Sequence, residues 1–303
     1  MPFDVVVVGS MNLDLVATAQ RLPGPGETVL GSDFAQYAGG KGLNQAVAAA
    51  RSDASTAMIA ALGDDDAGRL LRSVADREHI DTSGVSVIAG TPTGRALIVV
   101  DDQAENSIVV IPGANGRARF DELPSRLTAN GCVLAQLEVP LDTVTSAFAA
   151  ARAAGWQTVL NPAPSPVEGL PSELLAFCDV IVPNEHEVEL LGGVSLLLEH
   201  GVGAVVVTRG AAGVSVDEAS DRSKQWTVDA FDVTPVDTTG AGDAFCGALA
   251  ARLAAGDDLR RAVRYAAAAG GLATTASGAV SSIPRSAAVE RLLIAGPSVA
   301  HHG

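Results

Sequence analysis

Short apolar runs alternate with longer segments rich in alanine and leucine along most of the chain. The short runs contain β-branched residues and are predicted to be strands at residues 5–8, 58–62, 133–137, 158–160, 180–182 and 204–207. The longer segments are predicted to be helices at residues 43–51, 67–79, 141–154, 185–191, 241–255 and 259–275. Because this alternation is typical of βαβ units, we expect an α/β protein built around a buried parallel sheet.

Two regions interrupt the alternation. Residues 95–100 and 107–111 are apolar and flank a polar stretch, which predicts a β-hairpin. Together with the Pro- and Gly-rich residues 21–38, this hairpin is expected to form a small β layer that acts as a lid. The alternative is that the same segments extend the main sheet as antiparallel strands.

Charge and composition narrow the function classes. The 303 residues include 20 Lys and Arg against 35 Asp and Glu, a formal charge of −15, which argues against a nucleic-acid partner. The most apolar long segment, residues 190–208, contains Glu199, His200 and several glycines, so we expect no membrane span. Cys132, Cys178 and Cys246 are few and widely spaced, as reduced core thiols are, so a cytoplasmic location is expected.

The strongest local signal is the segment 236–243, VDTTGAGD, which runs directly into a predicted helix. Small residues allow a ligand to approach the backbone, and the N-terminus of a helix presents unpaired N–H groups that attract anions. Asp243 is out of place in an anion site unless it has another task, such as accepting a proton from an attacking hydroxyl. The alternative is that Asp243 only stabilises the first turn of the helix.

Two further segments offer groups suited to a sugar. Residues 39–46, GGKGLNQA, form a glycine turn before a helix but lack the spacing of a Walker A loop, so Lys41 and Asn44 are candidates for binding a polyhydroxyl ligand. Asn12 and Asp14 follow the first strand, at the sheet edge where α/β proteins bind ligands. An ordinary turn before a helix and Asx-turn chemistry are the alternatives for these two segments.

Other polar residues are expected at the same edge. Residues 183–187 and 207–213 each follow a predicted strand, and Glu138 follows residues 133–137. The alternatives are a first-turn acid for Glu187, a hairpin turn for Gly210 and Gly213, and a solvated loop residue for Glu138. Neither a zinc-binding spacing nor a G-x-S-x-G nucleophile elbow is found in the sequence.

Taken together, these segments resemble the ribokinase-like carbohydrate kinase family over essentially the whole chain. The two signatures of the family are matched by residues 39–46 and 237–243, and residues 9–14, 39–42, 111–115 and 161–164 are most similar to its ribose-phosphorylating members. The resemblance implies one α/β domain over residues 1–303, with a doubly wound (Rossmann-like), mostly parallel central sheet covered by helices on both faces. It also implies a small β-sheet lid from about residues 13–38 and 92–112, and transfer of the γ-phosphoryl group of ATP to the 5-hydroxyl of D-ribose.

The resemblance also implies roles for individual residues. Asp243 is the expected general base, and the backbone amides of Gly240, Ala241 and Gly242 form the expected anion hole. The sugar is expected on Asn12, Asp14, Gly40, Lys41, Asn44, Glu138 and Asp243. ATP is expected on Asn184, Glu187, Thr208, Arg209, Gly210, Gly213 and Gly242, with Glu187 acting through Mg²⁺ and its waters. An activating K⁺ ion is expected beside Asp237, Thr239, Ala273, Ala276, Gly278 and Ser282.

The chain departs from the family pattern at two positions. Ala267 stands where many members place a His or Asn near adenine, and Leu43 replaces a usual Ala in the glycine signature. A related kinase for 2-deoxyribose, fructose or adenosine and a non-catalytic sugar-binding protein remain as alternatives. The apolar residues of the predicted hairpin suggest a homodimer formed through the lid.

Overall fold

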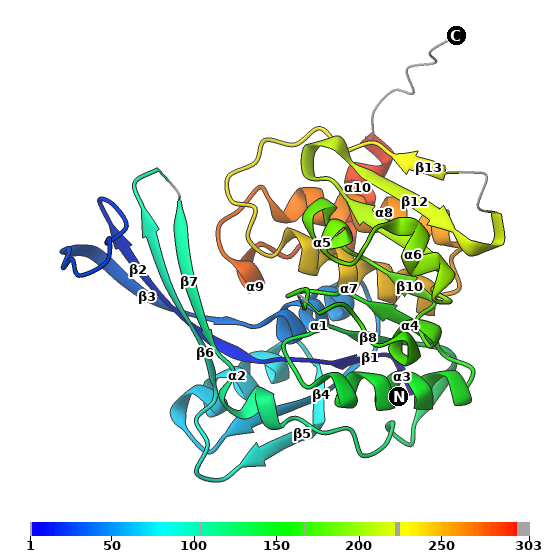
Figure 1. Ribbon diagram of the computed structural model, residues 1–303, viewed down its shortest axis with the longest axis horizontal. Coiled ribbons are helices and arrows are strands. Elements are labelled where there is room, and N and C mark those ends of the chain that lie inside the picture. The colour runs from blue at the N-terminus through cyan, green and yellow to red at the C-terminus, as the bar shows by residue number, and fades with distance from the viewer. Residues whose placement is uncertain (1, 104, 167, 222–224, 296–303) are drawn as a thin grey trace.

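The large sheet of the computed structural model is formed by nine strands in the order β13-β12-β11-β10-β9-β8-β1-β4-β5 (Figure 1). The structure describes residues 2–103, 105–166, 168–221 and 225–295. Neighbouring strands from β11 to β5 pair in parallel, whereas β12 and β13 are antiparallel. The strands are β1 (Phe3–Val8), β4 (Thr56–Gly63), β5 (Asp81–Ile88), β8 (Leu127–Ala135), β9 (Gln157–Leu160), β10 (Val180–Ile181), β11 (Ala204–Thr208), β12 (Val214–Glu218) and β13 (Gln225–Val228).

Helices cover both faces of this sheet, because its central strands are apolar on both sides. Within β1, Val5 and Val7 pack into one core with side chains of α1, α7 and α8, whereas Val6 and Val8 pack into a second core with α3, α4 and α6. The expectation of a doubly wound α/β fold is therefore confirmed. The helices are α1 (Lys41–Arg51), α2 (Asp66–Arg77), α3 (Leu141–Ala153), α4 (Ser172–Ala176), α5 (Glu185–Leu190), α6 (Val194–Glu199), α7 (Ala241–Ala254), α8 (Leu259–Ala273), α9 (Ala279–Ser282) and α10 (Ser286–Ala295).

A second, separate sheet of four strands lies beside the large one and extends away from it (Figure 1). Its order is β3-β2-β6-β7, with β2 (Asn12–Ala19), β3 (Gly31–Gly39), β6 (Gly94–Asp101) and β7 (Asn106–Ile111). The predicted hairpin is therefore present as β6 and β7, and the alternative of an extension of the main sheet is wrong. Strand β2 begins with Asn12 and β6 begins with Gly94, and these two residues are paired. The small sheet therefore begins at the predicted sugar-binding edge.

Several elements carry too little pattern to be predicted from the sequence. The edge strand β5 has only one buried residue, Val85, so it lacks an apolar run. The antiparallel β12 and β13 and the short α4 and α6 also lie outside the predicted elements. Within the described residues, no helix has both the length and the apolar character needed to cross a bilayer.

Candidate active site

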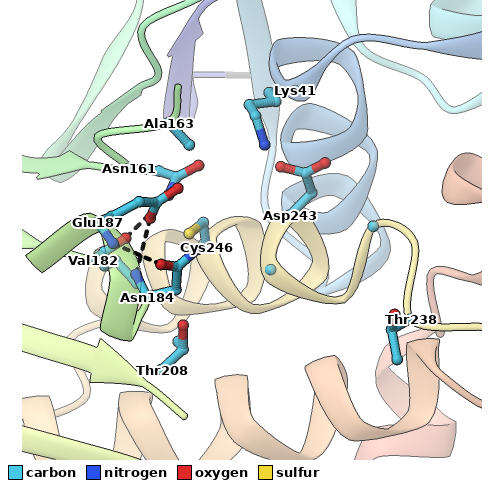
Figure 2. A pocket seen from close by; sticks show the side chains of 12 residues that line it. Lys41, Asn161, Ala163, Val182, Asn184, Glu187, Thr208, Thr238, Asp243 and Cys246 are labelled. Carbon is cyan, nitrogen blue, oxygen red and sulfur yellow. Dashed lines mark hydrogen bonds between the residues drawn. The ribbon is translucent and has the colours of Figure 1, made fainter. Parts of the chain in front are cut away.

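A cavity of about 230 Å³ lies where the carboxyl ends of the central strands meet the start of α7. Seven of the residues predicted from the sequence line it: Lys41, Asn184, Glu187, Thr208, Gly240, Gly242 and Asp243. Figure 2 shows Lys41 and Asp243 on one side of this space and Asn161 and Glu187 on the other. Segments as far apart in sequence as Lys41 and Asp243 therefore meet at one sheet edge. This agrees with the strand-end rule, by which α/β proteins bind ligands at the carboxyl ends of their parallel strands.

Asp243 is buried at the start of α7 and is held by two amides of α1. Its Oδ2 accepts a hydrogen bond from Asn44 Nδ2 at 2.8 Å, and its Oδ1 accepts one from Gln45 Nε2 at 2.9 Å. Burial lowers the pKa of the nearby Lys41, but the charges of Asp243 and Glu138 outweigh burial, so that the pKa of Lys41 is raised. The site therefore pairs an oriented carboxylate with a lysine cation, which suits proton transfer beside an anionic group.

Glu138 links the first strand to the glycine turn. Its Oε2 accepts hydrogen bonds from the Ser10 hydroxyl, from Asn12 Nδ2 at 3.3 Å and from the backbone N–H of Lys41 at 3.2 Å. The Oδ1 of Asn12 in turn accepts from Asn115 Nδ2 at 2.7 Å. The solvated-loop alternative for Glu138 is therefore wrong, because the carboxylate is held between two segments of the predicted sugar site.

Asp14 lies on β2 directly over the glycine turn. A Cβ atom added to Gly39 would stand 2.1 Å from Asp14 Oδ2, and one added to Gly40, which has φ +89°, would stand 2.7 Å from the backbone nitrogen of Asn12. Only glycine fits at these positions, so the turn allows the β2 polar residues to approach closely. Burial, and then the charges of Glu138 and Asp243, raise the pKa of Asp14 to about 7.

Asn184 and Glu187 line the cavity and also begin α5. Asn184 Oδ1 accepts from the backbone N–H of Glu187 at 2.8 Å, and Glu187 Oε2 accepts from the backbone N–H of Asn184 at 2.9 Å, a reciprocal capping box. The first-turn alternative for Glu187 is therefore correct as local structure. Glu187 nevertheless faces the charge of Lys41 across the cavity.

Thr208, the last residue of β11, lines the cavity, whereas residues 209–213 of the turn that follows it do not. Arg209 lies 3.9 Å from Glu185, and Gly210 faces open space. Gly213 has φ +82°, and an added Cβ would stand 2.2 Å from the carbonyl oxygen of Val228. The hairpin-turn alternative is therefore correct for the two glycines, and their contact with ATP stays a prediction.

The loop around Gly278, which carries part of the set expected to hold K⁺, lies against the side chain of Asp237, just before the start of α7. Asp237 Oδ1 accepts from the backbone N–H of Thr239 at 2.9 Å, and its Oδ2 accepts from that of Gly278 at 2.9 Å. Burial raises the pKa of Asp237, but these hydrogen bonds outweigh burial and lower it. Gly240 has φ +76°, and an added Cβ would stand 3.1 Å from Ala279 Cα, so the turn before α7 packs against this loop.

The rest of the expected cation set is close in sequence to that loop. Ala273 is buried at the end of α8, Ala276 is exposed, and the buried Ser282 donates its hydroxyl to the carbonyl oxygen of Ala279 at 3.0 Å. In the part of the chain that the structure describes, no group of three or more His, Cys, Asp or Glu side chains is arranged to hold a metal ion.

The cavity is also lined by residues outside the sequence-predicted set, namely Asn161, Ala163, Val182, Thr238 and Cys246, and Gln45 holds Asp243 from behind it. Asn161 directly follows β9 and lines the cavity, so the strand-end rule used for Asn12 could have found it. Gln45 carries no such signal, because its bond to Asp243 depends on how α1 packs against α7. Thr238 and Cys246 also line the cavity, and the sulfur of Cys246 is at the same time part of the core, as predicted.

The two departures from the family pattern are apolar contacts in the structure. Leu43 is fully buried in the core beneath the glycine turn. Ala267 is half-buried on α8 and packs against the same core. Leu43 is therefore a packing position, as expected of a substitution for alanine inside a helix.

Comparison with known proteins agrees with these observations. The profile of the pfkB family carbohydrate kinases matches residues 3–286. The chain is 37% identical to a ribokinase of Haemophilus influenzae, covering 92% of this chain and 95% of that one, and 34% identical to a deoxyribokinase of Salmonella typhimurium, covering 93% and 95%. The structure of an Arabidopsis thaliana ribokinase complexed with ribose and ATP superposes with a TM-score of 0.88 at 30% identity, covering 97% and 99% of the two chains.

Proposed function

The chain belongs to the pfkB family of carbohydrate kinases, and we propose that it transfers the γ-phosphoryl group of ATP to the 5-hydroxyl of D-ribose. The products are D-ribose 5-phosphate and ADP. The observation that carries the proposal is the placement of Asp243, a buried carboxylate that accepts two amide hydrogen bonds in a cavity also lined by Lys41. Kinases of small alcohols need such a group to accept the hydroxyl proton.

Asp243 is the general base in this proposal. The 5-hydroxyl gives its proton to Asp243 as its oxygen bonds to the γ-phosphorus, and the bond from that phosphorus to the bridging oxygen of ADP breaks. Because the transition state of phosphoryl transfer is loose, the protein contributes mainly alignment and charge stabilisation. The N-terminus of the 14-residue helix α7 supplies the latter through the backbone amides of Gly240, Ala241 and Gly242.

The geometry of that turn requires one change on phosphate binding. The backbone N–H of Ala241 donates to the carbonyl oxygen of Thr238 at 3.2 Å. A phosphoryl oxygen at this position would take over that hydrogen bond. Gly240, in the left-handed conformation, gives the turn its shape.

The sugar site of the proposal consists of polar groups that surround Asp243. Asn44 Oδ1 is buried and has no hydrogen-bond partner among the described residues, which suits a hydroxyl donor from a ligand. Asp14 and Glu138 add acceptors, Lys41 adds a cation, and Asn12 and Gly40 complete the edge where the small sheet begins. We propose that this sheet is the lid that covers bound sugar within a single domain.

Asn184 and Thr208, on the opposite side of the cavity, and Gly242, at the start of α7, are proposed to contact ATP. Arg209, Gly210 and Gly213 are proposed to contact it further along the turn after β11. A divalent metal accompanies ATP in kinases, and Mg²⁺ is proposed here. Glu187 fits a role through water, because one of its oxygens is engaged in the capping box while the side chain lines the cavity. Bound Mg²⁺ would neutralise phosphate charge.

K⁺ is proposed as an activating ion beside the start of α7. The donors there are the Asp237 carboxylate, the Ser282 hydroxyl and backbone carbonyls near Thr239, Ala273, Ala276 and Gly278. All are oxygen ligands, which suit a hard cation. A bound cation would act on catalysis through Gly240, because the turn at Gly240 packs against Ala279 of this loop.

A homodimer through the small sheet completes the proposal. Strand β7 is exposed along its whole length, and Phe34, Ile108 and Val109 are each more than half exposed. Apolar residues on both faces of a sheet that extends from the molecule mark a contact surface. Light scattering that shows only monomer would count against this part. The proposal keeps the cytoplasmic location expected from the sequence, and the three buried, unpaired cysteines fit it.

The proposal is tested by ADP release from MgATP with D-ribose, 2-deoxyribose, fructose or adenosine as acceptor, in the presence of K⁺. Ribose-dependent turnover that the Asp243→Asn variant lacks would support both the substrate and the base. Turnover on 2-deoxyribose alone would favour the related deoxyribokinase activity, which the Salmonella relative makes the second candidate. If no acceptor is phosphorylated, a non-catalytic sugar-binding protein becomes the better interpretation.

A further inference from the structure

Three buried amide side chains lie behind Asp243 and form a continuous hydrogen-bonded chain. Gln136, which follows β8, donates from Nε2 to Gln45 Oε1 at 2.6 Å. Gln45 donates from Nε2 both to Asp243 Oδ1 at 2.9 Å and to Asn161 Oδ1 at 3.1 Å. Asn161 donates from Nδ2 to the carbonyl oxygen of Val182 at 3.0 Å. Gln45 and Gln136 are fully buried and do not line the cavity.

The donor-to-acceptor direction of this row of hydrogen bonds is fixed at one end by the backbone carbonyl of Val182. A carbonyl oxygen only accepts hydrogen bonds, so Asn161 must turn its amide nitrogen toward Val182 and its oxygen toward Gln45. Gln45 must then present its nitrogen to Asn161 and its oxygen to Gln136. Because each amide has one donor end and one acceptor end, Gln45 can offer only an N–H group to Asp243.

The packing around Gln136 indicates that this amide is not a simple filler of the core. A Cβ atom added to Gly9 would stand 2.0 Å from Gln136 Oε1, so glycine at the end of β1 is needed to admit the side chain. The same Oε1 atom is buried without a hydrogen-bond partner among the described residues. An apolar side chain would avoid that unmet acceptor, but it could not donate to Gln45.

We propose that Gln45, oriented by Gln136 and Asn161, is a positioning residue that holds the Asp243 carboxylate for proton transfer. Asn44 holds Oδ2 and Gln45 holds Oδ1, so consecutive residues of α1 fix the rotation of the carboxylate about its side-chain bond. Asn44 Oδ1 is buried and has no hydrogen-bond partner among the described residues, so it is available to a ligand, whereas both polar atoms of the Gln45 side chain are engaged by Asp243, Asn161 and Gln136. This inference rests on the proposed function of Asp243 as general base.

Steady-state kinetics of Gln45→Met test the proposal. The methionine keeps the length of the side chain but removes the N–H donor, so kcat is expected to fall about 10- to 100-fold, the range for a misplaced catalytic group. The KM for ribose is expected to change less than about two-fold, because Gln45 does not line the cavity. The matched control is Asn44→Ala, one residue earlier, which is expected to raise the KM for ribose as well.

Gln136→Met tests the chain one step farther from the base. This substitution is also expected to lower kcat, by a smaller factor than Gln45→Met does. The double variant is expected to be no slower than Gln45→Met, because both residues act through the hydrogen bond from Gln45 to Asp243. Heat-unfolding midpoints are measured for each variant. If Gln45→Met does not fold, Gln45→Ala, which removes the donor to Asp243 without adding a charge beside it, is expected to show the same loss of kcat.

The outcomes separate the positioning proposal from the function on which it rests. Unchanged kcat in Gln45→Met, together with an inactive Asp243→Asn variant, would overturn the positioning role and leave the base in place. Parallel changes of kcat and KM, as in Asn44→Ala, would also overturn it, since they indicate a substrate contact. Full activity of Asp243→Asn, or no turnover by the unchanged chain on any acceptor, would overturn the proposed function and the positioning role together.

Discussion

The charge on Asp14 is expected to destabilise the folded protein, and replacing Asp14 with Asn is expected to remove that destabilisation. Burial, and then the charges of Glu138 and Asp243, raise the pKa of Asp14 from 3.8 to about 7. Because the folded state holds this proton more tightly than the unfolded chain, the stability that Asp14 contributes is fully present below pH 3.8 and is lost as the pH rises through 7. The shift corresponds to roughly 4 kcal/mol, at about 1.4 kcal/mol for each pKa unit.

The Asp14→Asn variant has a similar shape but no charge, so it lacks this pH-dependent loss. About 2.6 kcal/mol of the loss falls between pH 5 and pH 8. The substitution is therefore expected to raise the free energy of unfolding by about 2.6 kcal/mol more at pH 8 than at pH 5. We also expect it to weaken ribose binding, so that a residue of the sugar site is retained at a cost in stability.

Urea unfolding at pH 5 and pH 8, followed by the fluorescence of Trp156 and Trp226, measures the difference. Taking the difference between variant and wild type at each pH removes the contributions of the other titrating groups. Asp102→Asn, in the exposed turn between β6 and β7, is the matched control and should show no pH-dependent change. If Asp14→Asn changes stability equally at the two pH values, to within about 0.5 kcal/mol, the reasoning about its buried charge is refuted.

Three further substitutions test the elements around the site. Gly240→Ala should lower the free energy of unfolding by about 1–2 kcal/mol and reduce turnover, because φ is +76° and the new Cβ meets Ala279. Unfolding and ADP-release assays that show neither change would contradict this expectation. Arg51→Met should cost about 3 kcal/mol, because it removes the bidentate partner of Glu78. Since Arg51 holds the pKa of Glu78 low, that loss should be larger at pH 8 than at pH 4 in urea unfolding, and an equal loss would count against it. Asp237→Asn should abolish stimulation of ADP release by K⁺; stimulation equal to that of the wild type would exclude Asp237 from the ion site.

The position of each site segment along the sheet could be predicted because it depends on local patterns. An apolar run followed by a polar residue marks the carboxyl end of a strand, and parallel strands place those ends at one edge. Asn12, Glu138, Asn184 and Thr208 follow this rule, and the structure brings them to the same edge. The rule failed to separate Thr208 from Arg209, since one step past the strand end is enough to turn a side chain out of the cavity.

Contacts between distant side chains could not be predicted in this way. Asn44 and Asp243 are 199 positions apart, and their hydrogen bond depends on the angle at which α1 packs against α7. The glycines of the turn have a similar explanation, because Gly39 and Gly40 leave room for Asp14 and for the backbone of Asn12. Sequence patterns identify such residues as unusual, but the contact that explains each of them is made with a distant segment of the chain.

The sequence by itself determined the α/β class, the order of the central strands and helices along the chain, and the segments that approach the sheet edge. It did so because hydrophobic periodicity and glycine turns are local properties of the chain. Only the tertiary structure decided that β2, β3, β6 and β7 form a separate sheet, that Gln45 faces Asp243, and that the pKa of Asp14 lies near 7. These depend on which distant groups share a buried space, where burial and nearby charge act together.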